Sequence, residues 1–246
     1  MTDTSLSTGL HIEARPFSSL GKRDHGWLKP NFHFSFSDYY DPARMSWGAI
    51  RVWNDDEIAA QSGFAPHAHD NMEIITIPLE GDLAHKDSMG NESIIKTGDV
   101  QVMSAGTGIR HSEFNPNASE RTKLFQIWVF PKIRNVEPRY QQISLDTTEQ
   151  KNNFAQILSP NPEDAGVWIH QDAWFYLADF EAGFSKNYEL KKEGNGLYVF
   201  VISGTITVDG QELETRDGLG LTDFKTLDIT ATTDTKFLLM EIPMEL

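Results

Sequence analysis

Residues 73–103 read EIITIPLEGDLAHKDSMGNESIIKTGDVQVM, and this stretch decides the fold. Short runs rich in Ile and Val stop at Gly81 and again at Gly98, which is the pattern of strands joined by tight turns. Residues 197–221, LYVFVISGTITVDGQELETRDGLGL, repeat that order of strands and turns with a tighter hairpin. The repeat predicts an all-β fold in which one antiparallel meander is built twice, as a sandwich, barrel or jelly roll.

Strand-like patterns continue outside the repeat. In NFHFSFSDYY, residues 31–40, aromatic and polar residues alternate, which predicts a half-buried strand with three phenylalanines on one face. Helical periodicity is scarce, and residues 56–61 and 148–157 are the best candidates for short helices.

A polar segment with two prolines, PKIRNVEPRY at residues 131–140, separates the two copies of the meander. We therefore predict an N-terminal domain at residues 1–135 and a C-terminal domain at residues 136–246. The second copy has no histidine from Gly194 to its end, so any histidine-based site is expected in the first domain.

The composition excludes several classes of function. The net charge is -15, from 36 acidic and 21 basic residues, so direct binding to nucleic acid or to an anionic membrane is disfavoured. Cysteine is absent, which excludes disulfides, thiolate nucleophiles and Cys-based metal sites. The first residues carry no apolar signal segment, and no run is long enough to span a membrane. A cytoplasmic protein is the expectation, with any metal bound by His and carboxylate.

Two pairs of metal-ligand residues follow i, i+2 spacing: His67 with His69, and His111 with Glu113. Residues i and i+2 share one face of a strand, so each pair can point both side chains at one place. The inward faces of separate strands converge inside a β-barrel, which would bring the four side chains around one ion. Three imidazoles and a carboxylate suit Fe(II), Mn, Ni, Cu, Co or Zn, and an octahedral ion would keep two positions for substrate or O₂.

Glu73 is a rival to Glu113, because an unbroken strand from His69 would place it on the same face. Asp70 and Asn71 interrupt that strand pattern, which favours a structural carboxylate at position 73. The five remaining histidines stand alone in the sequence and are expected to be structural: His11, His25, His33, His85 and His170.

The motifs resemble those of the pirin family of cupins. GFAPHAHDNMEIITIPLEG, residues 63–81, is similar to the first cupin motif. GDVQVMSAGTGIRHSEFNP, residues 98–116, resembles the second motif in its pirin form, Ser-Ala-Gly-x-Gly-Ile-x-His-x-Glu. DHGWLKPNFHFSFSDYYDP, residues 24–42, also resembles bacterial pirins, and the likeness runs from about residue 11 to the C-terminus.

This resemblance implies a bicupin of two stacked antiparallel, jelly-roll-type barrels with only the first metallated. It implies that His67, His69, His111 and Glu113 hold the metal and that Glu73 does not. In the family the metal is usually iron, so Fe(II) is expected first, with Ni, Cu, Co, Mn and Zn as alternatives.

Bacterial pirins described as quercetin 2,3-dioxygenases imply an enzyme that opens a flavonol such as quercetin with O₂ and loss of carbon monoxide. A flavonol would bind the ion through its 3-hydroxyl and 4-carbonyl oxygens, and Glu113 would act as the base for the hydroxyl proton. Residues near the motifs are candidates to line an apolar slot for this small aromatic substrate, with core packing as the alternative for each: Phe34, Phe64, Met72, Met103 and Phe114.

Two other functions share the donor set. Some family members are reported as transcriptional cofactors, which implies a non-enzymatic, redox-sensing regulator that acts through a protein partner; the acidic charge suits such a partner better than DNA. A zinc-dependent sugar isomerase of the cupin type is the third reading, but no Gly-rich phosphate loop or basic cluster supports it.

Overall fold

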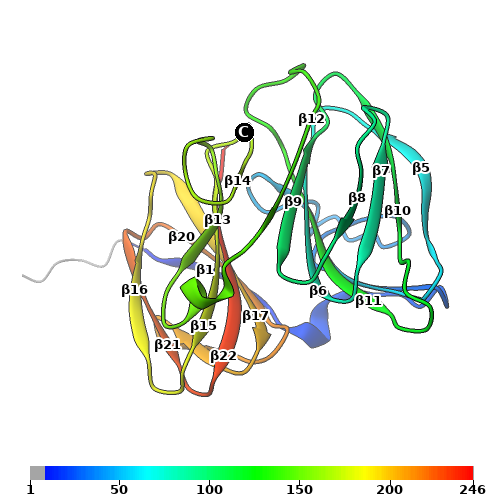
Figure 1. Cartoon of the computed structure of the whole chain (residues 1–246). Coiled ribbons are helices and arrows are strands. Elements are labelled where there is room, and N and C mark those ends of the chain that lie inside the picture. The colour runs from blue at the N-terminus through cyan, green and yellow to red at the C-terminus, as the bar shows by residue number, and fades with distance from the viewer. Residues whose placement is uncertain (1–8, 246) are drawn as a thin grey trace, which may run out of the picture.

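A computed structural model describes residues 9–245 and consists of two β-sandwich domains side by side (Figure 1). Each domain packs a seven-stranded sheet against a four-stranded sheet. The predicted all-β class is confirmed, although within the described residues the sheets form open sandwiches and not closed barrels.

In the N-terminal domain, inner strands of the four-stranded sheet alternate in burial, whereas the central strands of the seven-stranded sheet are buried along most of their length because the second domain covers their outer face. Its seven-stranded sheet has the order β12 (Arg139–Ser144), β9 (Asp99–Ser104), β6 (Glu73–Glu80), β11 (Thr122–Val129), β4 (Ile50–Ile58), β3 (Leu28–Phe32), β2 (Gly21–Lys22). Its four-stranded sheet has the order β5 (Gly63–His69), β10 (Ile109–Phe114), β7 (Leu83–Asp87), β8 (Glu92–Ile95).

The C-terminal domain repeats this architecture, as the sequence repeat predicts. Its seven-stranded sheet has the order β1 (His11–Arg15), β20 (Gly218–Thr222), β17 (Asn195–Ser203), β22 (Thr235–Pro243), β15 (Trp174–Phe180), β13 (Ala155–Ser159), β14 (Val167–Trp168). Its four-stranded sheet has the order β16 (Ser185–Glu189), β21 (Thr226–Ala231), β18 (Ile206–Val208), β19 (Gln211–Leu213).

Helical structure is limited to two short 3-10 turns within residues 9–245, η1 (Phe17–Ser19) and η2 (Thr147–Gln150). The prediction of a helix at 56–61 is wrong, because that stretch finishes strand β4 and turns into β5. The candidate at 148–157 keeps only η2 before β13 begins. No helix among the described residues is long and apolar enough to cross a bilayer.

The largest core lies between the two seven-stranded sheets. Trp53 and Phe125 of the N-terminal domain meet Phe200 of the C-terminal domain, with ring centroids 4.6 to 5.2 Å apart. His33 stacks on Trp53, and its Nδ1 lies 2.7 Å from the hydroxyl of Tyr198 across the interface. Burying these aromatic faces stabilises the pairing of the domains and explains why both sheets are apolar on their outer faces.

This interface also corrects the strand predicted at residues 31–40. Strand β3 ends at Phe32, and the next three residues are buried whether polar or apolar, because the chain runs between the domains there. Alternating aromatics indicated a strand, but burial by a second domain removes the solvent-facing side that such a pattern assumes.

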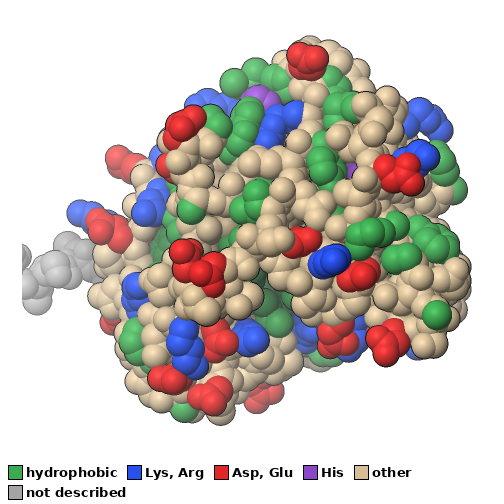
Figure 2. All heavy atoms as spheres, in the orientation of Figure 1, with side chains coloured by type: hydrophobic (Ala, Val, Ile, Leu, Met, Phe, Trp, Pro, Cys, Tyr) green, Lys and Arg blue, Asp and Glu red, His purple; other side chains and the backbone are tan. Residues whose placement is uncertain are grey.

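Two strands cross between the domains. β1 pairs with β20 in the C-terminal sheet, and β12 pairs with β9 in the N-terminal sheet. The boundary near residue 135 stays a prediction, and each seven-stranded sheet contains one strand from the far side of it. Figure 2 shows Lys and Arg side chains interspersed with Asp and Glu on the face drawn, with no broad basic surface there.

Candidate metal centre

Strands β5 and β10 bring the predicted histidines together. His67 and His69 lie two residues apart on β5, so both side chains leave the same face of the strand. The antiparallel register places His111 of β10 directly opposite His67. The i, i+2 spacing therefore produces the convergence that the sequence predicts.

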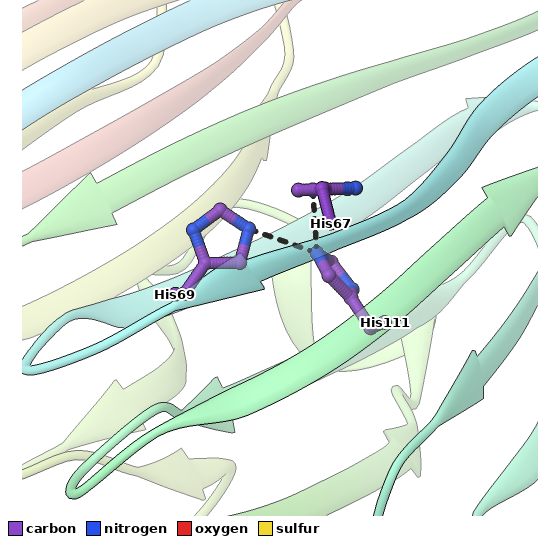
Figure 3. Close-up of side chains that lie close together, drawn as sticks. All are labelled: His67, His69 and His111. Carbon is purple, nitrogen blue, oxygen red and sulfur yellow. Dashed lines mark hydrogen bonds between the residues drawn. The ribbon is translucent and has the colours of Figure 1, made fainter.

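The three imidazoles converge on a single point (Figure 3). The Nε2 atom of His111 lies 3.0 Å from Nε2 of His69 and 3.0 Å from Nε2 of His67. One ligand atom from each ring belongs to a group whose members all lie within 4.8 Å of one another. Two nitrogens that bind one ion at right angles, each about 2.1 Å from it, are about 3 Å apart. The spacing thus fits adjacent ligands of one ion.

The protonation states of these rings also suit metal binding. Burial, with the neighbouring imidazoles, lowers the pKa of His111 to about 2 and that of His69 to about 4. Both rings are therefore neutral near pH 7, and a neutral ring nitrogen keeps a lone pair for a metal. His67 Nδ1 lies 2.9 Å from the carbonyl oxygen of Ala65. Donation of the Nδ1 proton to that carbonyl leaves Nε2 free to act as a ligand.

Glu113 faces the same interior as His111 but lies outside the three-nitrogen group. A register shift between His111 and Glu113 places Glu113 opposite Phe64 of β5. The carboxylate is buried and accepts hydrogen bonds from Nε2 of Gln126 at 3.0 and 3.3 Å. Burial raises the pKa of Glu113 to about 7, although the Gln126 hydrogen bonds lower it in part. Its role as a ligand remains a prediction.

Glu73 lies outside the three-nitrogen group, and its structural role stays a prediction. Strand β5 ends at His69, Asn71 has a φ of 45°, and β6 starts afresh at Glu73, so the face is not continued. Its carboxylate accepts a hydrogen bond from the hydroxyl of Ser104 at 2.6 Å. The backbone of His170 in the C-terminal domain is close enough to help lower the pKa of Glu73. Glu73 therefore faces the domain interface and not the imidazoles.

One histidine outside the motifs lies beside the centre. The ring of His85, on β7, is 5.4 Å from that of His111, and its Nε2 lies 3.3 Å from a carboxylate oxygen of Asp87. His85 is outside the three-nitrogen group, and burial lowers its pKa. His33 and His170 lie at the domain interface, away from the three rings.

Aromatic side chains flank the imidazoles. Trp128 of β11 meets the ring of His69 edge-on at 4.8 Å, and Phe64 lies 6.4 Å from the ring of His67. Met72 and Met103 belong with Trp128 to the apolar cluster on the His69 side. These residues form an apolar surround on which a flat ligand can rest.

Two candidates for the slot lie elsewhere. Phe34 is fully buried in the core between the domains, so it packs and does not line the site. Phe114 is 40% exposed on the outer face of β10, opposite to His111. Sequence reasoning missed Trp128 and Gln126, although KLFQIWVF alternates so that Leu124, Gln126 and Trp128 share one face.

Comparison with known proteins identifies the family. The family described as Pirin matches residues 13–129, and the family described as Quercetinase C-terminal cupin domain matches residues 156–242. This chain belongs to the pirin family. As the resemblance implied, it is a bicupin.

Relatives of this pirin extend over nearly its whole length. It is 43% identical to a pirin-like protein of Caulobacter vibrioides, over 94% of this chain and 99% of that protein. It is 40% identical to a quercetin 2,3-dioxygenase of Escherichia coli, over the same shares of the two chains.

Solved pirin structures have the same fold. The crystal structure of YhhW from Escherichia coli has a TM-score of 0.90 at 39% identity, covering 95% of this pirin and 98% of that chain. The structure of bacterial pirin YhhW in complex with nickel(II) has a TM-score of 0.90 at 38% identity, covering 95% and 99% of the two chains.

The residues of this pirin chain fit a divalent transition metal. Three imidazoles whose Nε2 atoms face one another form a borderline nitrogen donor set, which such ions prefer. Nε2 of His111 faces the Nε2 atoms of His67 and His69, and its buried Nδ1 has no hydrogen-bond partner among residues 9–245. A bound cation would satisfy all three lone pairs together.

Proposed function

We propose that this pirin is a metal-dependent dioxygenase that opens a flavonol such as quercetin with O₂ and releases carbon monoxide. The observation that carries the proposal is the convergence of three imidazole nitrogens beside a separate buried carboxylate. A relative 40% identical over nearly the whole chain is described as a quercetin 2,3-dioxygenase, which supports the same reaction.

His67, His69 and His111 would hold the ion, with Glu113 as a fourth ligand that can leave it. Fe(II) is the metal we propose, with Ni, Cu, Co, Mn and Zn as ions that the same donors accept. When bound, iron supplies Lewis acidity and the capacity to exchange single electrons with O₂.

Glu113 would remove the proton of the flavonol 3-hydroxyl at a carboxylate oxygen. Its pKa of about 7, raised by burial, suits a base that works near neutral pH. Trp128 and Phe64 flank the imidazoles and would exclude water from one side of the flat substrate. In the overall reaction one O₂ enters, the heterocycle opens and one carbon leaves as carbon monoxide.

The test is a reaction started from defined components. Protein loaded anaerobically with Fe(II) should, after addition of quercetin and air, consume O₂ and release carbon monoxide as the flavonol absorbance falls. Loading with Mn, Ni, Co and Cu in parallel identifies the active ion. Absence of turnover with all five ions would overturn the proposal and favour a metal-binding regulator with a protein partner.

A further inference from the structure

A pair of polar side chains lies behind Glu113, in a sheet that also buries Asn54, Asp56 and Gln101. Thr76 of β6 and Gln126 of β11 are register partners, and both point into the N-terminal sandwich. Both are buried, Thr76 completely. Buried polar groups on neighbouring strands stabilise a sheet only when they find hydrogen-bond partners, so their contacts show what they hold in place.

The hydrogen bonds run from Thr76 through Gln126 to Glu113. The Thr76 hydroxyl donates to Oε1 of Gln126 at 3.4 Å, which orients the amide so that its NH₂ group faces Glu113. That NH₂ group donates to both oxygens of the carboxylate, at 3.0 and 3.3 Å. Within residues 9–245 no other side chain donates a hydrogen bond to these two oxygens.

These hydrogen bonds hold the Glu113 carboxylate outside the group of three imidazole nitrogens. The three imidazoles are close enough together to share one ion, and Glu113 is not among them. Each carboxylate oxygen that accepts a hydrogen bond from Gln126 offers less electron density to a cation. The amide and a metal ion therefore compete for the same two oxygens.

We infer that Gln126, oriented by Thr76, is a positioning residue that restrains Glu113 from permanent coordination and keeps it as an exchangeable ligand. The inference rests on the metal ligand set proposed above. An exchangeable carboxylate leaves a position on the ion for substrate and is free to accept the substrate proton. A permanently bound carboxylate would do neither.

Cobalt(II) is the probe, because its visible absorption bands report the number and type of its ligands. In Gln126→Leu the carboxylate loses both hydrogen bonds and should bind the ion, so the cobalt spectrum should change and the dissociation constant for cobalt should fall about tenfold. In Thr76→Val the amide loses its anchor and can rotate its oxygen toward Glu113. The same spectral change should appear, with a decrease in dissociation constant of about threefold.

Gln156→Leu is the matched control. Gln156 lies on β13 of the C-terminal domain and donates one hydrogen bond to the carbonyl of Ala165. This variant should keep the cobalt spectrum and affinity of the parent protein. A purely structural role for Gln126 would lower thermal stability and leave the cobalt spectrum unchanged, and that result would overturn the inference.

Two further outcomes are decisive. Weaker cobalt binding by Gln126→Leu would mean that the amide presents the carboxylate to the ion, which also overturns the inference. If Gln126→Leu fails to fold, judged by circular dichroism, Thr76→Val decides in the same way, since it replaces a hydroxyl by a methyl group of similar size.

A changed cobalt spectrum in a protein that never cleaves a flavonol would refute the proposed reaction alone. Unchanged cobalt binding in an active enzyme would refute the positioning role alone.

Discussion

Replacing Glu73 by Gln should change how the stability of the protein depends on pH. Glu73 is 1% exposed and lies at the domain interface, where the hydroxyl of Ser104 donates a hydrogen bond to it and the backbone of His170 is nearby. Burial raises its pKa from 4.5 to about 7, against the smaller opposing effects of Ser104 and Arg139. The folded protein therefore holds a proton on Glu73 at pH values where the unfolded chain has released it.

The direction and the size of the change in unfolding free energy follow from the difference between the folded-state and unfolded-state pKa values of Glu73. A raised pKa in the folded state contributes stability that is complete below pH 4.5 and is lost as the pH rises through about 7. The difference between the two pKa values corresponds to about 3 kcal/mol of unfolding free energy, most of it lost between pH 5 and pH 8. The Gln side chain does not titrate. The variant should therefore gain about 2 to 3 kcal/mol relative to the parent protein over that interval.

Urea denaturation of both metal-free proteins at pH 5, 6, 7 and 8 measures this difference, since all other titrating groups are common to the pair. Glu149, exposed on η2, supplies the matched control, and Glu149→Gln should leave the pH dependence unchanged. If the unfolding free energies of Glu73→Gln and the parent protein differ by the same amount at all four pH values, the reasoning is refuted. That result would mean that Glu73 is ionised in the folded state and paired with Arg139.

Three further results are expected. His67→Ala should lose bound metal and turnover because two imidazoles remain, whereas His170→Ala should keep both; elemental analysis and O₂ uptake check this. Tyr198→Phe leaves the buried His33 Nδ1 without its partner and should cost about 1 to 3 kcal/mol in denaturation, with metal content unchanged. Removing the metal with a chelator should lower the melting temperature by roughly 10 °C when the free ion had been a thousandfold above its dissociation constant, and an unchanged melting temperature would contradict a folded-state metal site.

The convergence of the histidines could be predicted because it depends on a local rule. Two residues apart on a strand means one shared face, and this holds for His67 and His69 whatever the rest of the chain does. Glu113 depends on the register between strands, and the shift after His111 that moves it opposite Phe64 leaves no mark in the sequence.

Long-range packing sets the remaining differences. The fate of Phe34 depends on a second domain that covers the outer face of the sheet, which strand periodicity cannot reveal. The importance of Gln126 could have been predicted from the sequence, because a single amide on the inward face of an apolar strand needs a buried hydrogen-bond partner. Finding that partner required the pairing of β11 with β6 and the place of Glu113 on the facing sheet.

The exchange of β1 and β12 has a consequence for synthesis on the ribosome. β12 is an edge strand of the N-terminal seven-stranded sheet, and it follows all the other strands of that domain in the sequence. This sheet is therefore complete only when the segment that leads into the C-terminal domain has left the ribosome. β1 precedes all the other described strands in the chain, whereas its partner β20 is among the last of them. The nascent chain must therefore carry β1 without its partner until β20 has been translated, a delay in which chaperones have their clearest opportunity to bind.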